Sequence, residues 1–179
     1  SDVPQMHMGS WYDPYTKTTT RNFTGLGAIK NSPIHMILGP WIHGAHDVSF
    51  AGDVDFGPQS MVSGDLADDY NDLRLRWFDR WLKGLDNGTD DDAPVKIFVM
   101  GGGDGQRTED DRLYHGGQWQ SMEAGPPSDA RASKLYFNGD GSLSATTPYS
   151  DAAPSAYQYD PQNPVPTVSG NISSGGDLI

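Results

Sequence analysis

The hydrophobic and polar positions of this chain predict a strand, a helix and a second strand in its first quarter. Two apolar runs, residues 3–12 (VPQMHMGSWY) and 34–42 (IHMILGPWI), flank a polar segment. Because the second run is nearly continuous rather than alternating, it predicts a strand buried on both faces, as in a parallel sheet. The segment between them, residues 15–30, predicts a helix interrupted at Gly25 and Gly27.

The strongest helical pattern covers residues 66–83, which read LADDYNDLRLRWFDRWLK. Asp65 is the predicted N-cap, and Gly84 is the predicted stop. The preceding residues 44–64 are rich in Gly and Asp and predict a loop. Apolar positions spaced by three or four residues lie on one helical face, which predicts packing against a core; they are Leu66, Tyr70, Leu73, Trp77 and Trp81.

The pattern changes after residues 86–94 (DNGTDDDAP), an acidic stretch rich in turn formers. We predict a domain boundary here, with residues 1–92 forming one part and residues 93–179 another. Short strands separated by turns are typical of a β-sandwich. The strands are predicted within residues 95–100, 134–144, with a turn at Gly139 and Gly141, 156–160 and the Pro-rich 163–170.

Composition excludes several classes of function. The net charge of −12 argues against binding to nucleic acid or to an anionic membrane surface, both of which require clustered Lys and Arg. No apolar stretch approaches the roughly 20 residues that span a bilayer. Without cysteine there is no disulfide, thiolate metal site or thiol nucleophile, but the compartment stays open between the cytoplasm and a secreted location.

The candidate chemistry lies where the two apolar runs end. Asp13 follows the first run, and His43 follows the second. Catalytic groups gather at the carboxyl ends of parallel strands, and a carboxylate can orient an imidazole and stabilise its protonated form. Both residues also have structural interpretations: Asp13 could cap a helix that starts with Pro14, and His43 could bond to backbone in a loop.

The serine of a Ser-Asp-His triad is not found in this chain. No G-x-S-x-G motif occurs, and GNISSGG near the end has the wrong spacing. Ser10 stands only three residues before Asp13, too close to form a separate nucleophile turn. The nucleophile is therefore expected outside this sequence.

Other candidates favour structural roles. His43 and His46 could form half a metal site, but no third ligand follows at a fixed spacing. The acidic run 86–92 lacks the register of a calcium loop, and GGGDG at 101–105 lacks the lysine of a phosphate loop. No metal or cofactor is therefore expected. Trp11, Tyr12 and Trp41 are candidates for an acyl pocket or for core packing; His7, His35 and His115 are expected to be structural.

Six stretches in one order resemble a known superfamily of α/β-hydrolases, the X-Pro dipeptidyl-peptidases, cocaine esterases and glutaryl acylases. They are DVPQMHMGSWYDPYTKTTTRNFTGL, HMILGPWIHG, DVDFGP, LRWFDRWLKG, PVKIFVMGGG and YDPQNPVPTVSGNISSGG. The resemblance implies the C-terminal part of an α/β-hydrolase domain followed by the start of a jelly-roll β domain. It also places Asp13 and His43 on the acid and the base of a triad that cleaves ester or amide bonds.

The same resemblance implies that the nucleophile, the cap and the oxyanion-hole donors precede this segment. We therefore expect a fragment or truncated frame of a longer bacterial hydrolase. Its partners would be a small acyl ester, amide or peptide substrate, and the N-terminal part of the enzyme or a second copy of the chain to cover an open sheet edge. The alternative is a non-catalytic, β-rich binding or assembly module.

Overall fold

The computed structural model describes residues 2–148, 154 and 156–165, which form mixed sheets with few helices. These residues divide into two compact units, the first ending at Gly125 and the second beginning at Pro126. The candidate residues Asp13 and His43 both belong to the first unit.

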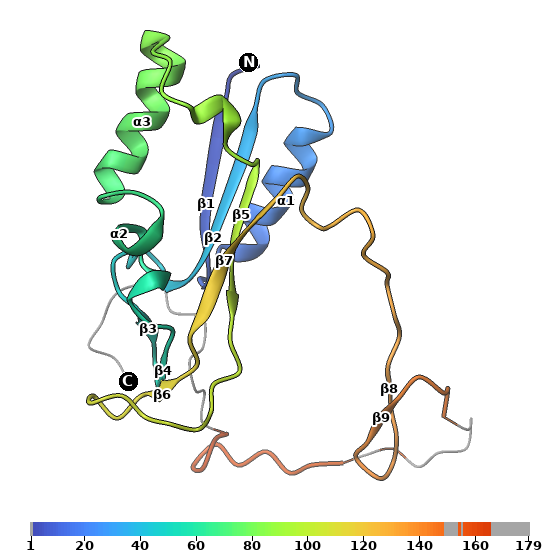
Figure 1. Ribbon diagram of the computed structural model, residues 1–179. Coiled ribbons are helices and arrows are strands. Elements are labelled where there is room, and N and C mark those ends of the chain that lie inside the picture. Colours follow the sequence, from blue (N-terminus) through green and yellow to red (C-terminus); the bar gives the residue numbers. More distant parts are fainter. Residues whose placement is uncertain (1, 149–153, 155, 166–179) are drawn as a thin grey trace. The chain divides into compact units, whose positions relative to one another are not determined.

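A four-stranded sheet organises the first unit (Figure 1). β1 (Gln5–Tyr12), β2 (Ile34–Ile42) and β5 (Val95–Met100) run parallel, and β7 (Gly117–Met122) pairs antiparallel with β5. The order is β1-β2-β5-β7, so β1 is an edge strand. The strands predicted over residues 3–12, 34–42 and 95–100 are confirmed, whereas β7 was not predicted.

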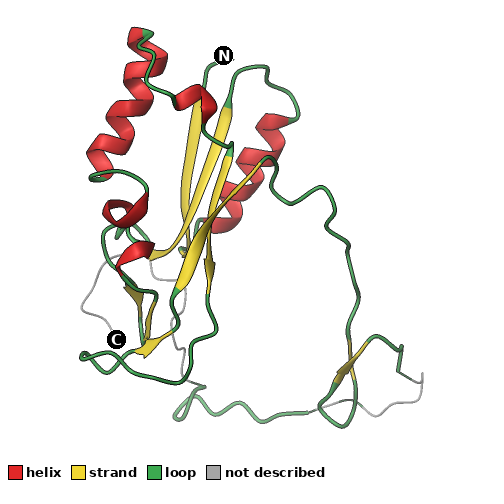
Figure 2. Ribbon diagram, in the orientation of Figure 1, coloured by secondary structure: helices red, strands yellow, loops and turns green. Residues whose placement is uncertain are grey.

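Helices cover both faces of this sheet (Figure 2). α1 (Thr16–Gly27) connects β1 to β2 and packs Phe23 against Met36 and Leu38. Ile37 points to the other face and packs with Leu73 of α3 (Tyr70–Lys83). The two helices lie on opposite faces because successive side chains of a strand alternate between its faces. β2 is therefore buried on both sides, as its continuous apolar run predicted.

The predicted interruption of α1 is wrong at Gly25, where the helix continues, but the helix does end at Gly27. Gly25 lies in its last turn, where the cost of glycine is small because few backbone bonds depend on it. No residue of α1 is fully buried, and a row of Thr hydroxyls bonds back to the carbonyls of the preceding turn.

The start predicted for the long helix is also wrong. α3 begins at Tyr70, and Asp69 caps it by accepting a 2.8 Å hydrogen bond from the Asp72 amide. Asp65 instead ends a short helix, α2 (Val62–Asp65). The predicted end is confirmed: Gly84 adopts a left-handed conformation with φ of 71°, which favours glycine.

Replacing Asp69 by Ala should destabilise the protein by about 1 kcal/mol, the usual cost of losing an N-cap side chain. Urea unfolding measures this change. Asp68→Ala is the matched control, since Asp68 precedes the cap and makes no side-chain hydrogen bond in the described structure. An equal loss in both variants would contradict the assignment of the cap.

The segment predicted as a loop, residues 44–64, contains short elements. These are β3 (Phe50–Ala51), β4 (Val54–Asp55), a 3-10 helix η1 (Pro58–Ser60) and α2, and β4 also pairs with β6 (Leu113–Tyr114). Phe56 is fully buried among Ala51, Val54 and Phe98. This segment is thus a packed part of the first unit that follows His43.

The second unit contains a hairpin of β8 (Tyr136–Phe137) and β9 (Leu143–Ser144), which confirms the turn predicted within residues 134–144. Residues 156–160 form no strand, so that prediction is wrong. Residues 163–165 form no strand either, and the rest of the segment predicted over 163–170 lies outside the described residues. The alternating pattern is short here, and the described side chains are exposed.

The predicted boundary between residues 92 and 93 follows a 3-10 helix, η2 (Thr89–Asp91). β5 begins just beyond it and pairs with β2, so one sheet contains residues from both sides. The division into compact units comes later, after Gly125. As a boundary between an α/β-hydrolase part and a jelly-roll part, the position stays a prediction.

Candidate active site

A bulge in β2 brings the ends of β1 and β2 to the same level. Ser10 pairs with Gly39, but Tyr12 pairs with Ile42, so β2 takes one residue more than β1 over this interval. Pro40 lies within the extra length, and proline suits a bulge because it has no N–H to donate. Asp13 and His43 each follow the Tyr12–Ile42 pair. If the register of Ser10 with Gly39 continued without this shift, Asp13 would lie opposite Ile42.

Asp13 and His43 form a direct hydrogen bond. Oδ2 of Asp13 lies 2.8 Å from Nδ1 of His43, which confirms the geometry predicted from sequence. The Asp13 side chain is 8% exposed, whereas the His43 side chain is 46% exposed. A buried carboxylate is therefore paired with an imidazole that solvent or a substrate can reach. Since Nδ1 faces the carboxylate, Nε2 is the ring nitrogen left to exchange a proton.

The turn after β1 holds the carboxylate in place. Oδ1 of Asp13 accepts a 2.7 Å hydrogen bond from the backbone N–H of Tyr15. The hydroxyl of Thr16 donates to the carbonyls of Ser10 and Asp13, which closes the turn at the start of α1. Both carboxylate oxygens thus have partners, as a buried carboxylate requires.

Two residues of this site were not predicted from sequence. Tyr15 supplies the backbone donor to Asp13, and its ring meets the His43 ring edge-on with centroids 5.2 Å apart. Thr16 supplies the hydroxyl that closes the turn. The sequence feature that could have identified them is their position just after Asp13. A Tyr-Thr pair at that position is not a distinctive motif.

His46 has a structural environment rather than that of a metal ligand. Its ring stacks on Tyr70 at 4.5 Å and meets the edge of Trp41 at 5.3 Å. Burial lowers the pKa of His46, an effect that Asp47 partly opposes and His43 reinforces. Among the residues that the structure describes, no three His, Cys, Asp or Glu side chains form a group that could hold a metal ion.

The lowered pKa of His46 should make the protein less stable in acid. The folded pKa lies below the unfolded value, so the unfolded chain binds more protons, and this contribution is lost as pH falls below about 6.5. Urea unfolding between about pH 7.5 and pH 5.5 measures the slope. His46→Phe keeps an aromatic ring and should flatten that slope. An unchanged slope would show that His46 contributes nothing to it.

The three aromatic residues beside the pair pack inward. Trp41 is fully buried, and its indole N–H donates to the Ser60 carbonyl at 2.9 Å. Trp11 donates to the Phe98 carbonyl at 3.0 Å. Tyr12 packs against Phe56 with ring centroids 5.9 Å apart. Of the two roles open for Trp41, the structure supports core packing.

The other histidines also contact neighbouring side chains. His35 meets the edge of Trp77 at 5.2 Å, and His115 meets Phe56 at 6.4 Å. Nε2 of His7 lies 3.2 Å from the side-chain oxygen of Gln5. All three therefore have packing or hydrogen-bonding partners within the first unit.

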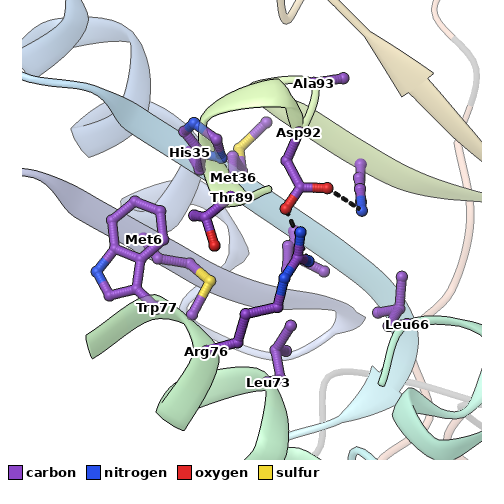
Figure 3. A pocket seen from close by; sticks show the side chains of 12 residues that line it. Met6, His35, Met36, Leu66, Leu73, Arg76, Trp77, Thr89, Asp92 and Ala93 are labelled. Atoms are coloured by element: carbon purple, nitrogen blue, oxygen red, sulfur yellow. Dashed lines mark hydrogen bonds and ion pairs between the residues drawn. The ribbon is translucent and has the colours of Figure 1, made fainter. Parts of the chain in front are cut away.

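A small cavity lies near the start of β1 and β2 (Figure 3). Asp13 and His43 follow the opposite ends of these strands. The cavity is lined partly by Met6, Met36 and Trp77. Asp92, which also lines it, pairs with Arg76 at 2.8 Å and with Lys96 at 3.1 Å. Asp90, from the same acidic run, pairs with Arg80. These ion pairs connect the acidic stretch 86–94 to α3 and β5. The carboxylates of Asp90 and Asp92 therefore have a structural role.

Comparisons with known proteins connect the chain with a superfamily of hydrolases. Residues 87–172 match the family described as the X-Pro dipeptidyl-peptidase C-terminal non-catalytic domain. The chain is also similar to the cocaine esterase of Rhodococcus sp. (strain MB1 Bresler), with 27% identity over 95% of its length. These matches confirm the resemblance to X-Pro dipeptidyl-peptidases and cocaine esterases.

The extent of each match matters for the site. The chain spans 28% of the length of the curated relative. The family match begins at residue 87, beyond both Asp13 and His43. The match covers the β-rich part of the chain. Separately, no helix in the described residues is long and apolar enough to cross a membrane.

Proposed function

We propose that this chain is part of a serine hydrolase that cleaves ester or amide bonds, with Asp13 and His43 as the acid and the base of a Ser-Asp-His triad. The observation that carries the proposal is the 2.8 Å hydrogen bond between a buried carboxylate and a half-exposed imidazole at the ends of adjacent parallel strands. That placement is typical of catalytic groups in α/β sheets.

The geometry supports the division of roles. Nε2 of His43 would accept the proton of a serine hydroxyl as that oxygen attacks the acyl carbon, and would then return it to the leaving group. Asp13 would hold Nδ1 protonated and stabilise the imidazolium. The sequence contains no G-x-S-x-G, and the resemblance to the superfamily implies that the serine and the oxyanion-hole donors would come from a part of the enzyme that precedes this segment.

The proposed architecture is the end of an α/β-hydrolase domain joined to the start of a jelly-roll β domain. Parallel β1, β2 and β5 with α1 and α3 on opposite faces support the first part. The match of residues 87–172 to a β-rich C-terminal domain supports the second. The substrate would be a small acyl ester, amide or peptide, and the named relative, an esterase, makes an ester the first to test.

A second function has one observation in its favour. The family that matches residues 87–172 is described as non-catalytic. The alternative proposal is therefore a β-rich module that binds or assembles with the rest of an enzyme, or with a second copy of this chain. In that case Asp13 and His43 would only stabilise the turn after β1.

The experiment compares the complete gene product with residues 1–179 alone, using p-nitrophenyl acetate and a fluorophosphonate probe. The complete product should be labelled and should hydrolyse the ester, whereas the isolated chain should do neither, since losing the nucleophile removes most of a roughly 10⁶-fold effect. Labelling of the isolated chain would reveal an unrecognised nucleophile. A complete product that is never labelled would favour the non-catalytic module.

A further inference from the structure

We propose that Tyr15 is a positioning residue, which holds the Asp13–His43 pair through its backbone on one side and its ring on the other. The inference rests on the proposed function for its catalytic meaning, because a positioned imidazole matters only if His43 exchanges protons. The geometry of the contact itself is independent of that function. Tyr15 contacts both candidate residues in space, although it follows Asp13 by only two positions.

The backbone contact orients the carboxylate. The N–H of Tyr15 lies 2.7 Å from Oδ1 of Asp13, and Oδ2 is bound to Nδ1 of His43. The two bonds together fix the plane of the carboxylate and leave one oxygen for the imidazole. Any side chain other than proline at position 15 would keep this contact, because it comes from the main chain.

The ring contact acts on the imidazole. The rings of Tyr15 and His43 meet at 67° with centroids 5.2 Å apart. Edge-to-face pairs at such distances are favourable. Among the ring pairs found in the described residues, Tyr15 is the partner of His43.

The exposure of Tyr15 argues that this contact is not ordinary core packing. Tyr15 is 55% exposed, whereas Trp41, in β2 near His43, is fully buried. An exposed tyrosine gains little from burial, and its hydroxyl makes no hydrogen bond in the described structure. We infer that the ring restricts the imidazole of His43, which has one hydrogen bond and is nearly half exposed.

The first test is NMR on the 179-residue chain with ¹⁵N-labelled histidine. The Nδ1–H of His43 should give a protected resonance in the wild-type chain and in Tyr15→Phe. In Tyr15→Leu and Tyr15→Met its solvent exchange should be about two- to tenfold faster, because an aromatic pair stabilises by about 0.5–1.5 kcal/mol. Tyr157→Leu is the control, since Tyr157 is an exposed ring of the second unit.

Three outcomes would overturn the proposal. Unchanged exchange in Tyr15→Leu and Tyr15→Met would show that the ring does not restrict His43. A Tyr15→Phe variant that behaves like Tyr15→Leu would assign the effect to the hydroxyl. Loss of cooperative unfolding in both aliphatic variants would show a structural role instead.

The second test uses the complete gene product and separates this inference from the proposed function. If the product hydrolyses p-nitrophenyl acetate, Tyr15→Leu should lower kcat about two- to tenfold with little change in KM, and Tyr15→Phe should restore it. If the product is active and Tyr15→Leu leaves its kcat unchanged, the inference alone is overturned. An inactive product with the NMR effect intact would overturn the proposed function alone.

Discussion

Replacing Asp13 by Asn in the complete gene product should lower kcat for ester hydrolysis by about 10⁴-fold. The reason lies in the two contacts of the carboxylate. The Tyr15 N–H donates to Oδ1, so the amide oxygen of the introduced side chain would take that place and its NH₂ would face His43. An N–H donor there forces Nδ1 to accept and moves the ring proton to Nε2. His43 would then have no free nitrogen to receive the proton of the nucleophile.

The change conserves shape, so the fold should persist, and circular dichroism checks this. Asp129→Asn is the matched control, because Asp129 is an exposed carboxylate of the second unit. It should leave kcat unchanged. A loss below about tenfold in Asp13→Asn would contradict the triad, since that is far less than a wrong tautomer costs.

Trp41→Ala should lower the free energy of unfolding by about 3–5 kcal/mol, the range for truncating a buried aromatic side chain. Trp41 is fully buried and packs with Ile37, Val62 and Leu73. Its loss would also leave the Ser60 carbonyl without the indole donor. Urea unfolding of the 179-residue chain measures the change.

Two further variants serve as comparisons for Trp41→Ala. Trp41→Phe keeps part of the volume and should cost less than Trp41→Ala, although it also removes the indole donor. Phe137→Ala is the control, because Phe137 is 85% exposed and should change the stability by less than about 0.5 kcal/mol. A cost of Trp41→Ala below about 1 kcal/mol would mean that the core around β2 is not packed as described.

The central strands were predictable because their environment is visible in local pattern. β2 is buried by α1 on one face and α3 on the other, and burial on both faces demands the continuous apolar run of residues 34–42. The end of α3 was predictable for a similar reason, because a left-handed terminus favours Gly84. The pairing of Asp13 with His43 followed from their places after two parallel strands.

Other features depended on choices that local pattern leaves open. Asp65, Asp68 and Asp69 all have side chains that suit an N-cap, so the local pattern does not show that α3 starts after Asp69. β7 has a largely polar sequence, GQWQSM, and becomes a strand because β5 offers it an edge. The ring contact of Tyr15 with His43 joins residues 28 positions apart, beyond the reach of any local pattern.

The pairing of β1 with β2 gives this part of the chain two different tolerances to changes in length. Deleting one residue between Gly39 and Ile42 would remove the bulge and leave Tyr12 opposite Ile42. Deleting one residue from the regular part of β2, between Ile34 and Gly39, would instead turn the side chains on one side of the deletion toward the opposite face of the sheet. Beyond His43, the connection to α3 contains short elements and turns, where insertions alter no register between β1 and β2. In a lineage that descends from this chain, length variation is therefore expected to be rarer between Ile34 and Gly39 than after His43.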